Sequence, residues 1–308
     1  MLRAILLELA KSPALRRWII SHDTTRGMAR RFVPGEELAA AIDAARVCNR
    51  AGMTASLDHL GENVVTRDDA ERARSSYTQA LDRIPAEGIE ANVSLKLTHL
   101  GLDLGEEFCA GQLRQVTRRA RELNNFVRVD MEGSAYTDRT LRLVKQARAE
   151  TDAVGTVIQA YLYRSEEDVR ALLGIGCRIR LVKGAYKEPS QIAFRRMKDV
   201  DANFVKLMKI LLPSGIYHAL ATHDPKMIEA TIRFAAEQNI TKDRFEFQML
   251  YGIRTDLQSQ LVRQGYRMRV YIPFGVDWFP YFMRRLAERP ANLAFFAKNF
   301  LRGSASRT

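Results

Sequence analysis

The chain has 308 residues, enough for one large α/β barrel or two ordinary domains, and its 46% hydrophobic and 27% charged residues are ordinary for a folded protein. Its formal net charge of +12 would attract nucleic acid, anionic lipid or an anionic ligand, without choosing among them. No apolar run approaches the roughly 20 residues that a transmembrane helix needs, so we predict none.

The first 50 residues precede any β-like run, and we predict that they form extra helices packed on the main domain. A signal peptide is not expected, because the apolar stretch Ala4–Ala10 is short, is interrupted by Glu8 and lacks a small-residue cleavage site. Two interpretations of residues 1–20 stay open. They form an amphipathic helix that touches an anionic membrane, or a helix that only packs on the protein.

Eight short β-like runs follow, and charged stretches with helical periodicity separate them. The runs are Met53–Asp58, Ala91–Leu97, Phe126–Met131, Thr156–Leu162, Arg178–Lys183, Tyr217–Ala221, Phe245–Leu250 and Met268–Ile272. Examples of the helical stretches are Asp68–Arg83, Gly111–Leu123, Asp138–Thr151, Glu166–Leu173 and Pro225–Gln238. Strands that alternate with helices in this way indicate parallel βαβ units, and eight such strands close a barrel.

An open doubly wound sheet is the structural alternative to a barrel. It is disfavoured because the first run leads into Asp58-His59-Leu60-Gly61-Glu62 and not into a Gly-rich phosphate loop. We therefore predict an α/β fold with a (βα)8 TIM-type barrel over residues 51–308 and an N-terminal helical extension over residues 1–50.

Polar residues gather where the predicted strands end, and in a barrel these ends form one rim that carries the catalytic residues. Helix capping would explain any one of them, but their accumulation predicts a charged binding site. In chain order the rim residues are Asp58, Glu62, Lys96, His99, Asp130, Glu132, Gln159, Arg164, Arg180, Lys183, Tyr186, Thr222, His223, Asp224, Gln248, Tyr251, Tyr271 and Asp277.

The fifth predicted strand carries charge among apolar neighbours. Arg180 and Gly184 are in phase, which places charge toward the barrel interior or its mouth. A buried charge needs a partner or a ligand, and Gly184 lets a flat ligand or another backbone approach closely. An ion pair inside the barrel is the alternative.

After the sixth strand, Asp224 suits the N-cap of a helix that begins at Pro225, and His223 is either a ligand contact or part of the capped turn.

A predicted helix near residue 280 brings two arginines onto one face. Pro280 fits its first turn. Tyr281, Arg284, Arg285 and Glu288 follow the i, i+3, i+4, i+7 spacing and therefore share a face. Two guanidinium groups on one face suit a carboxylate or a phosphate. The alternative is an exposed face held by salt bridges.

Cysteine and histidine usage gives no sign of a metal site. Cys48, Cys109 and Cys177 are far apart and odd in number, so neither a disulfide framework nor a zinc spacing can be drawn. We expect them to be buried small side chains in a reducing cytoplasm. The five histidines include no H-x-x-x-H pair, and no G-x-S-x-G elbow indicates nucleophilic hydrolysis.

Taken together, these segments resemble the proline dehydrogenase family, which includes monofunctional enzymes and one domain of the bifunctional proline utilisation flavoenzymes. The matches run in order from about residue 54 to residue 298, one per predicted strand or its loop, and the most specific is Y-F-x-R-R-x-x-E at residues 281–288. The others are Leu57–Glu62, Val93–Leu97, Val129–Glu132, Gln159–Tyr161, Arg180–Tyr186, Ala221–Asp224, Phe247–Gly252 and the remainder of Tyr271–Arg285. The resemblance implies a distorted (βα)8 barrel with FAD at its mouth.

The resemblance also implies a role for individual residues. Arg284 and Arg285 would bind the proline carboxylate together with Lys96, and Asp130 would balance the charge of Lys96. The implied catalytic residues are Lys96, Asp130, Tyr271, Arg284 and Arg285, and the pyrrolidine pocket would be lined by Tyr186, Leu250, Tyr271 and Tyr281. The implied FAD-binding residues are Asp130, Gln159, Arg180, Val182, Lys183, Gly184, Ala185, Thr222, His223 and Glu288. Glu62 would close over the substrate by pairing with an arginine after the fifth strand, for which Arg196 is the candidate.

The activity implied by the resemblance is oxidation of L-proline to Δ1-pyrroline-5-carboxylate, with hydride transfer from C5 to FAD N5 and electrons passed to a quinone. It is the first step of proline catabolism to glutamate. The amine must be neutral for that transfer, so activity should rise with pH. We expect a separate pyrroline-5-carboxylate dehydrogenase, because the chain ends soon after the last helix, and peripheral contact with the inner face of the membrane.

One departure from the family pattern and three alternatives accompany this reading. Lys187 stands where bifunctional relatives carry a Trp beside the flavin, which puts the FAD conformation in doubt.

The high pI suggests a nucleic-acid-binding protein, but no zinc-finger, RNP or basic-zipper motif supports it, and we expect no nucleic acid partner. A folate-linked flavin barrel would need a pterin-reading site. Hydroxyproline is disfavoured as substrate because Tyr271 leaves little room for a ring hydroxyl.

Overall fold

Eight parallel strands pair in chain order and close into a barrel, since β1 pairs with both β2 and β8. This computed structural model describes residue 27 and residues 29–287, with the backbone alone for residues 286 and 287. The strands are β1 Thr54–His59, β2 Ala91–Leu95, β3 Val127–Val129, β4 Val154–Gln159, β5 Arg178–Val182, β6 His218–Ala221, β7 Phe245–Leu250 and β8 Arg267–Phe274. Each overlaps its predicted run, which confirms the barrel and excludes the open sheet.

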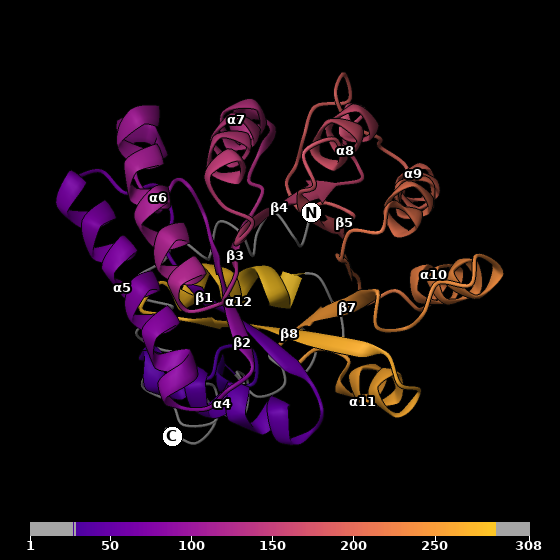
Figure 1. Cartoon of the computed structure of the whole chain (residues 1–308), viewed down its shortest axis with the longest axis horizontal. Coiled ribbons are helices and arrows are strands. Elements are labelled where there is room, and N and C mark those ends of the chain that lie inside the picture. Colours follow the sequence, from indigo (N-terminus) through magenta and orange to yellow (C-terminus); the bar gives the residue numbers. More distant parts are fainter. Residues whose placement is uncertain (1–26, 28, 288–308) are drawn as a thin grey trace, which may run out of the picture.

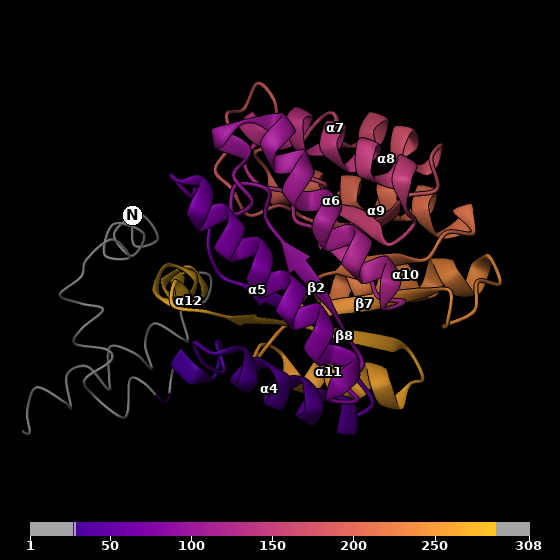
Figure 2. The ribbon, with the colours of Figure 1, turned by 60° about the vertical axis from the view of Figure 1, so that its left-hand side comes forward.

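Helices surround the barrel (Figure 1). They are α4 Leu38–Arg50, α5 Arg67–Ala86, α6 Glu106–Glu122, α7 Ser134–Glu150, α8 Ser165–Leu173, α9 Met197–Leu211, α10 Pro225–Glu237, α11 Thr255–Arg263 and α12 Trp278–Ala287, with short 3-10 turns at Leu102–Leu104 and Leu212–Ser214. The helix α4 packs against β8 and β1. The helix that follows β8, α12, lies instead at one end of the barrel, on the left of Figure 2. A helix from outside the repeat therefore covers the last strand, which makes the barrel distorted.

The predicted N-terminal extension falls partly within the described residues. Its helix α4 packs on the barrel through Ala41, Ile42 and Ala45, which are buried. The segment of residues 1–20, with its two interpretations, lies outside the described residues. The division of the chain at residue 50 stays a prediction.

The fourth predicted strand runs past the observed one. The strand β4 ends at Gln159, whereas the apolar run continues to Leu162. Tyr161 and Leu162 are buried in a separate small cluster with Ala193, under the loop that follows β5. These apolar side chains therefore pack beneath a loop and do not extend the strand. A hydrophobicity pattern does not distinguish these two kinds of burial.

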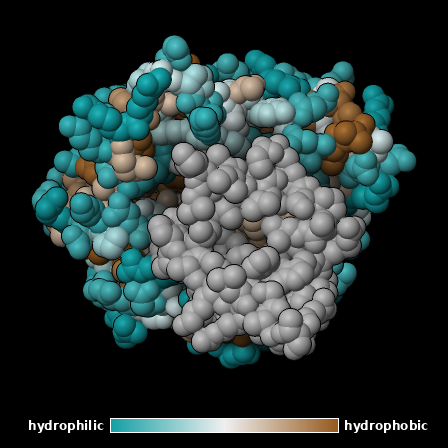
Figure 3. Space-filling view, turned by 180° about the vertical axis from the view of Figure 1, so that it is seen from behind, coloured by the Kyte–Doolittle hydropathy of each residue, from teal (hydrophilic) through white to brown (hydrophobic). Residues whose placement is uncertain are grey.

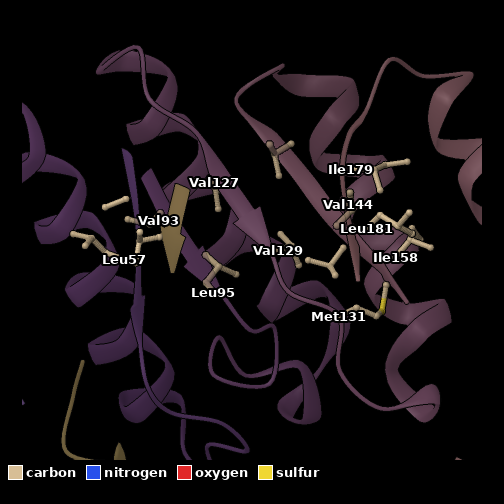
Figure 4. Close-up of a cluster of buried hydrophobic side chains, with 14 of the residues drawn as sticks. Leu57, Val93, Leu95, Val127, Val129, Met131, Val144, Ile158, Ile179 and Leu181 are labelled. Atoms are coloured by element: carbon tan, nitrogen blue, oxygen red, sulfur yellow. The ribbon is translucent and has the colours of Figure 1, made fainter. Parts of the chain in front are cut away.

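Strand residues alternate between an apolar outer face and a polar inner face, as the strand period requires. The outward side chains pack under the helices and form the main core; Leu57, Val93, Leu95, Val127, Val129, Ile179 and Leu181 are among those in Figure 4. The inward side chains join strands inside the barrel: Arg180 on β5 donates across it to Ser94 Oγ on β2 at 2.9 Å, and Arg269 on β8 pairs with Glu246 on the neighbouring strand β7 at 2.8 Å. Barrels are usually filled by branched aliphatic layers, so this interior is unusually polar and orients its charges through hydrogen bonds.

The described surface carries few large apolar side chains, and on the face seen in Figure 3 it is mostly hydrophilic. Within residues 27 and 29–287, no helix has the length and hydropathy to cross a bilayer. The three cysteines are free and buried, as predicted.

We expect His218 to make folding sensitive to mild acid. Its side chain is fully buried in β6, where Nδ1 accepts a hydrogen bond from the Ile179 backbone at 3.0 Å. Burial, aided by the Arg128 charge, lowers its pKa from 6.5 to about 3. The folded protein thus holds His218 neutral, while the unfolded chain takes up a proton below pH 6.5, so stability present above that pH is lost as the pH falls toward 3.

The measurement is the free energy of unfolding by urea at several pH values near 5 to 6. In the His218→Asn variant, whose amide oxygen replaces the acceptor, the slope against pH should fall by about 1.4 kcal/mol per pH unit. An unchanged slope would show that His218 does not carry this linkage.

Candidate active site

A carboxylate, a guanidinium and a phenol from three strands meet at the centre of the barrel mouth. Asp130, just after β3, accepts hydrogen bonds from Arg180 Nη1 at 2.6 Å and from Tyr271 Oη at 2.7 Å. The Arg180 guanidinium also lies 5.2 Å from the Tyr271 ring centroid. Burial, followed by the Asp130 charge, raises the pKa of Tyr271, which keeps its hydroxyl protonated as a donor. The cluster is thus fixed from all three sides.

Lys96, just after β2, is a buried cation surrounded by carboxylates. It is 9% exposed. Burial opposes its charge, but Asp58, Glu62 and Asp130 outweigh that effect, and the pKa of Lys96 is raised. The ammonium group is therefore charged at neutral pH. Lys96 also senses the positive charge of Arg284, which places two of the predicted carboxylate-binding cations within electrostatic reach of each other.

The predicted pairing of Asp130 with Lys96 is only partly what the structure shows. The Asp130 charge acts on Lys96, but its hydrogen bonds go to Arg180 and Tyr271. For Arg180, the alternative of an ion pair inside the barrel is the observed arrangement, with its side chain 6% exposed. Arg180 still has its Nε buried without a hydrogen-bond partner among the described residues, so the pair does not use its full donor capacity.

Two buried carboxyl groups, both among the predicted rim residues, were given no individual role. Asp58 at the end of β1 is 1% exposed, and its Oδ1 has no hydrogen-bond partner among the described residues. Burial raises its pKa, and the charge of Lys96 opposes that rise. Glu132 is 4% exposed and accepts a hydrogen bond from Thr98 Oγ1 at 2.7 Å. Their position at strand ends was the available signal, but polarity at a strand end does not separate a buried carboxyl from a helix cap.

The helix α12 contributes the arginine face. It begins at Trp278, which confirms the prediction that Pro280 lies in its first turn. The Arg285 guanidinium carbon lies 5.1 Å from the Tyr281 ring centroid, so these two residues share a face as predicted. The Arg284 charge acts on Lys96 and on the phenol of Tyr186. Glu288, the last member of the predicted face, lies outside the described residues.

The predicted cofactor residues Val182, Lys183, Gly184 and Ala185 lie at the end of β5 and in the segment after it, followed by Tyr186. The Lys183 ammonium pairs with Asp201 at 2.5 Å and with Asp224 at 2.6 Å. These carboxylates raise the pKa of Lys183 against the effect of burial. Lys183 was predicted to contact the cofactor, and here it joins the loop after β5 to α9 and to the start of α10.

Gly184 has a positive φ of 118°, and a Cβ there would collide with the ring of Tyr161. The close approach predicted at this glycine is therefore made, within the described residues, by a tyrosine ring. We expect Gly184→Ala to lower the free energy of unfolding by about 2 kcal/mol, from overpacking and backbone strain.

The matched control is Gly111→Ala. Gly111 lies inside α6 with nothing within 4 Å of the added methyl group, so that variant should be as stable as the parent or up to about 1 kcal/mol more stable. Equal thermal midpoints for the two variants would contradict the assigned role of Gly184.

Three other predicted cofactor residues form hydrogen bonds between their side chains and nearby backbone groups. Gln159 donates to the Glu132 carbonyl at 2.9 Å, and Thr222 Oγ1 accepts from the Asp224 amide at 3.1 Å. His223 Nε2 accepts from the Leu250 amide at 2.9 Å, so it joins the ends of β6 and β7. The predicted cap is confirmed: Asp224 is the N-cap of α10 and accepts from the Lys226 amide.

The two predicted gate residues are not joined in this structure. Glu62 is exposed in the loop after β1. Arg196 precedes α9, is 68% exposed on its side chain, and forms a bidentate pair with Asp199 at 2.6 and 3.0 Å. The Arg196 guanidinium thus pairs with a carboxylate one turn into the helix. The sequence alone does not show that Asp199 and not Glu62 is its partner. In the part of the chain that is described, no group of three or more His, Cys, Asp or Glu side chains could hold a metal ion.

Comparisons with known proteins agree with one another. Residues 41–298 match the family model described as proline dehydrogenase. The chain is 43% identical to proline dehydrogenase 1 of Bacillus subtilis (strain 168) over 98% of this chain and 100% of that protein. It is 39% identical to proline dehydrogenase of Deinococcus radiodurans, with 98% of each chain covered.

A similar solved structure is that of proline utilization A from Bdellovibrio bacteriovorus, inactivated by N-propargylglycine. It superimposes with a TM-score of 0.80 at 29% identity, over 85% of this chain and 32% of that one. The present chain thus corresponds to about a third of that larger protein.

Proposed function

The chain belongs to the proline dehydrogenase family, and we propose that its barrel mouth binds FAD and L-proline side by side, with the residues described above in distinct roles. Members of this family are flavoenzymes that oxidise proline in its catabolism and pass the electrons to an acceptor.

The mouth of the barrel fits FAD by the chemistry of its donors. Arg180 has a buried Nε without a partner among the described residues and lies at the centre of the site. Gln159, Thr222 and His223 offer further polar groups around the ends of β4 and β6. Asp130, Val182, Lys183, Gly184, Ala185 and Glu288 complete the proposed set. When bound, FAD supplies the acceptor for the hydride that leaves C5 of proline.

The substrate side is built from cations around one carboxylate position. Arg284 and Arg285 would hold the proline carboxylate through their planar donor forks, and Lys96 would add a point charge. Tyr186, Leu250, Tyr271 and Tyr281 would enclose the apolar ring. This arrangement fixes the orientation of the pyrrolidine ring. The same cations favour loss of the ammonium proton, so the neutral amine that the oxidation needs becomes more populated as the pH rises.

Closure and electron transfer complete the proposal. Glu62 would close over bound proline, and Arg196 would have to leave Asp199 to meet it. A membrane quinone is the proposed acceptor, reached by peripheral contact of a basic protein with the inner face of the membrane. A separate pyrroline-5-carboxylate dehydrogenase would carry out the next oxidation.

The observation that carries the proposal is the meeting of Lys96, the Asp130–Arg180–Tyr271 cluster and Arg284 of α12 at one barrel mouth. The test is anaerobic titration of the purified protein with L-proline while the flavin absorbance is followed. Bleaching at stoichiometric flavin is the expected result. A protein without flavin, or a flavin that stays oxidised with excess proline, would refute the proposal.

A further inference from the structure

The helix that carries the two arginines is tied at its start to a segment more than 240 residues earlier in the chain. The indole Nε1 of Trp278, the first residue of α12, donates a hydrogen bond to Glu36 Oε1 at 2.8 Å, across a separation of 242 residues. Trp278 is 7% exposed, whereas Glu36 lies at the surface just before α4. A carboxylate acceptor makes this bond charge-assisted and therefore stronger than a neutral one.

Aromatic packing continues the contact along α12. The Phe32 ring lies 6.0 Å from Phe282, and Trp278 lies 6.0 Å from the same ring. Phe32 and Val33 are buried in a cluster with Trp278, Phe279 and Phe282, apart from the main core. The residues of this second cluster thus come from the segment 29–33 and from α12, with Leu60 and Ile253 at the ends of neighbouring loops.

Backbone contacts seat the same segment at the barrel mouth. The Gly275 amide donates to the Gly35 carbonyl at 3.3 Å, in the turn that leads from β8 into α12. The Arg31 carbonyl lies where a side chain at Gly252 would be, so the segment also packs closely on the loop after β7. We call residues 29–36 the brace. Together these contacts fix where α12 begins and which way it faces.

Because α12 is a short continuous helix, the position of its first residue affects the positions of the arginines near its C-terminal end. Arg284 and Arg285 lie six and seven residues after Trp278, or about 9 to 10.5 Å along a helix with a rise of 1.5 Å per residue. Phe282 and Met283, just before them, are fully buried. A small rotation or slide of α12 at its start is therefore transmitted to both guanidinium groups. Displaced guanidinium groups would hold the substrate carboxylate less well, so the effect falls on proline binding.

We propose that Glu36 is a positioning residue for the proline carboxylate, because its hydrogen bond to Trp278 sets the position of α12 and hence of Arg284 and Arg285. The inference rests on the proposed role of these arginines. Glu36 itself touches neither substrate nor cofactor in this arrangement. Its contribution should appear in KM for proline and much less in kcat or in flavin binding.

Two substitutions at Glu36 separate the hydrogen bond from the rest of the side chain. Glu36→Ala removes the acceptor and should raise KM for L-proline about five-fold, the effect of losing one such bond, with kcat within about two-fold of the parent. Glu36→Gln keeps an acceptor oxygen and should restore KM to within about two-fold of the parent. Flavin content should be the same in all three proteins.

Trp278→Phe completes a double-mutant cycle. It keeps an aromatic ring in the cluster but removes the indole donor together with part of the buried ring, so it should raise KM at least as much as Glu36→Ala. Adding Glu36→Ala to Trp278→Phe should then change KM no further. Additive effects of the two substitutions would overturn the proposal, because they would show that the two groups act independently.

Two controls make failure informative. Glu87→Ala is matched in residue type and also removes a partly buried hydrogen bond between distant elements, that with Arg46 at 2.9 Å, but it has no contact with α12. It should leave KM for proline unchanged. Arg285→Met tests the underlying role. If Arg285→Met raises KM and Glu36→Ala does not, the brace is structural only and this inference fails. If Arg285→Met leaves KM unchanged, the proposed function of α12 fails instead.

Discussion

Replacing Arg285 with methionine is expected to raise KM for L-proline about a hundred-fold while the protein keeps its flavin. Methionine keeps an unbranched apolar stem but removes the guanidinium, and with it the contact of the guanidinium carbon with the Tyr281 ring, whose centroid lies 5.1 Å away. What is lost is a charged donor fork to the substrate carboxylate. Loss of two charge-assisted bonds amounts to about 3 kcal/mol, and each 1.4 kcal/mol is about ten-fold in affinity.

The measurement is steady-state kinetics over proline concentration, together with the flavin-to-protein ratio of the purified variant. Arg142→Met is the matched control, because Arg142 on α7 is 60% exposed and pairs with Glu106 at 2.9 Å on the surface. That variant should resemble the parent in KM. Equal losses of proline and flavin binding by Arg285→Met would contradict the assignment of Arg285 to the substrate.

The barrel and its rim could be predicted from the sequence because both depend on short-range periodicity. A residue such as Val129 alternates with Arg128 and Asp130, and this period of two already separates the outer face from the inner face. The charged ends of the strands then lie on one rim because all eight strands are parallel. The arginine face of α12 is predictable for the same reason, since helical spacing places Tyr281 and Arg285 together.

Partner choice inside the site could not be predicted, because it depends on distances across the barrel. Asp130 is 50 residues from Arg180 and 141 residues from Tyr271, yet it bonds both. Asp201 and Asp224 surround the ammonium group of Lys183, and the assignment of Lys183 to the cofactor stays a prediction. Arg196 pairs with Asp199, three residues away in the chain, and not with the predicted Glu62. In each case the ion pair observed within the chain depends on packing between distant or neighbouring elements.

The contacts of the brace could not be predicted from the sequence either, because they join two segments from opposite ends of the chain. Phe32 and Glu36 lie in a stretch that the sequence assigns only to extra helices packed on the barrel. Their contacts with Trp278 and Phe282 at the other end of the chain arise because α12 leaves the outer ring and lies at the end of the barrel. A pattern of period 3.6 predicts that α12 is a helix, but not which surface it covers.

Replacing Asp130 with alanine is expected to lower both stability and activity strongly. The carboxylate is the acceptor for Arg180 at 2.6 Å and for Tyr271 at 2.7 Å, and the Arg180 side chain is 6% exposed. Removal of one partner from a buried ion pair typically costs about 3 to 5 kcal/mol, because the remaining charge stays buried without compensation. Lys96 would lose one of the three carboxylates that keep it charged. We therefore expect the free energy of unfolding to fall by about 3 kcal/mol.

Activity should fall by about a hundred-fold in kcat/KM, since the freed guanidinium would repel Lys96 and the two arginines of α12 around the carboxylate position. Asp138→Ala is the matched control: Asp138 is 71% exposed and pairs with Arg164 at 2.6 Å, so its loss should cost less than about 1 kcal/mol. The measurements are urea unfolding and kinetics on the flavin-loaded proteins.

The double variant Asp130→Ala with Arg180→Met distinguishes repulsion from a simple loss of packing. Removing both charges of a buried pair is far less costly than removing one, so the double variant should recover much of the stability lost in Asp130→Ala. Its activity should stay low, because the Arg180 guanidinium is itself proposed to contact the flavin. If instead the double variant is less stable than either single variant, Asp130 and Arg180 do not compensate each other, and the polar interior of this barrel is held by other contacts.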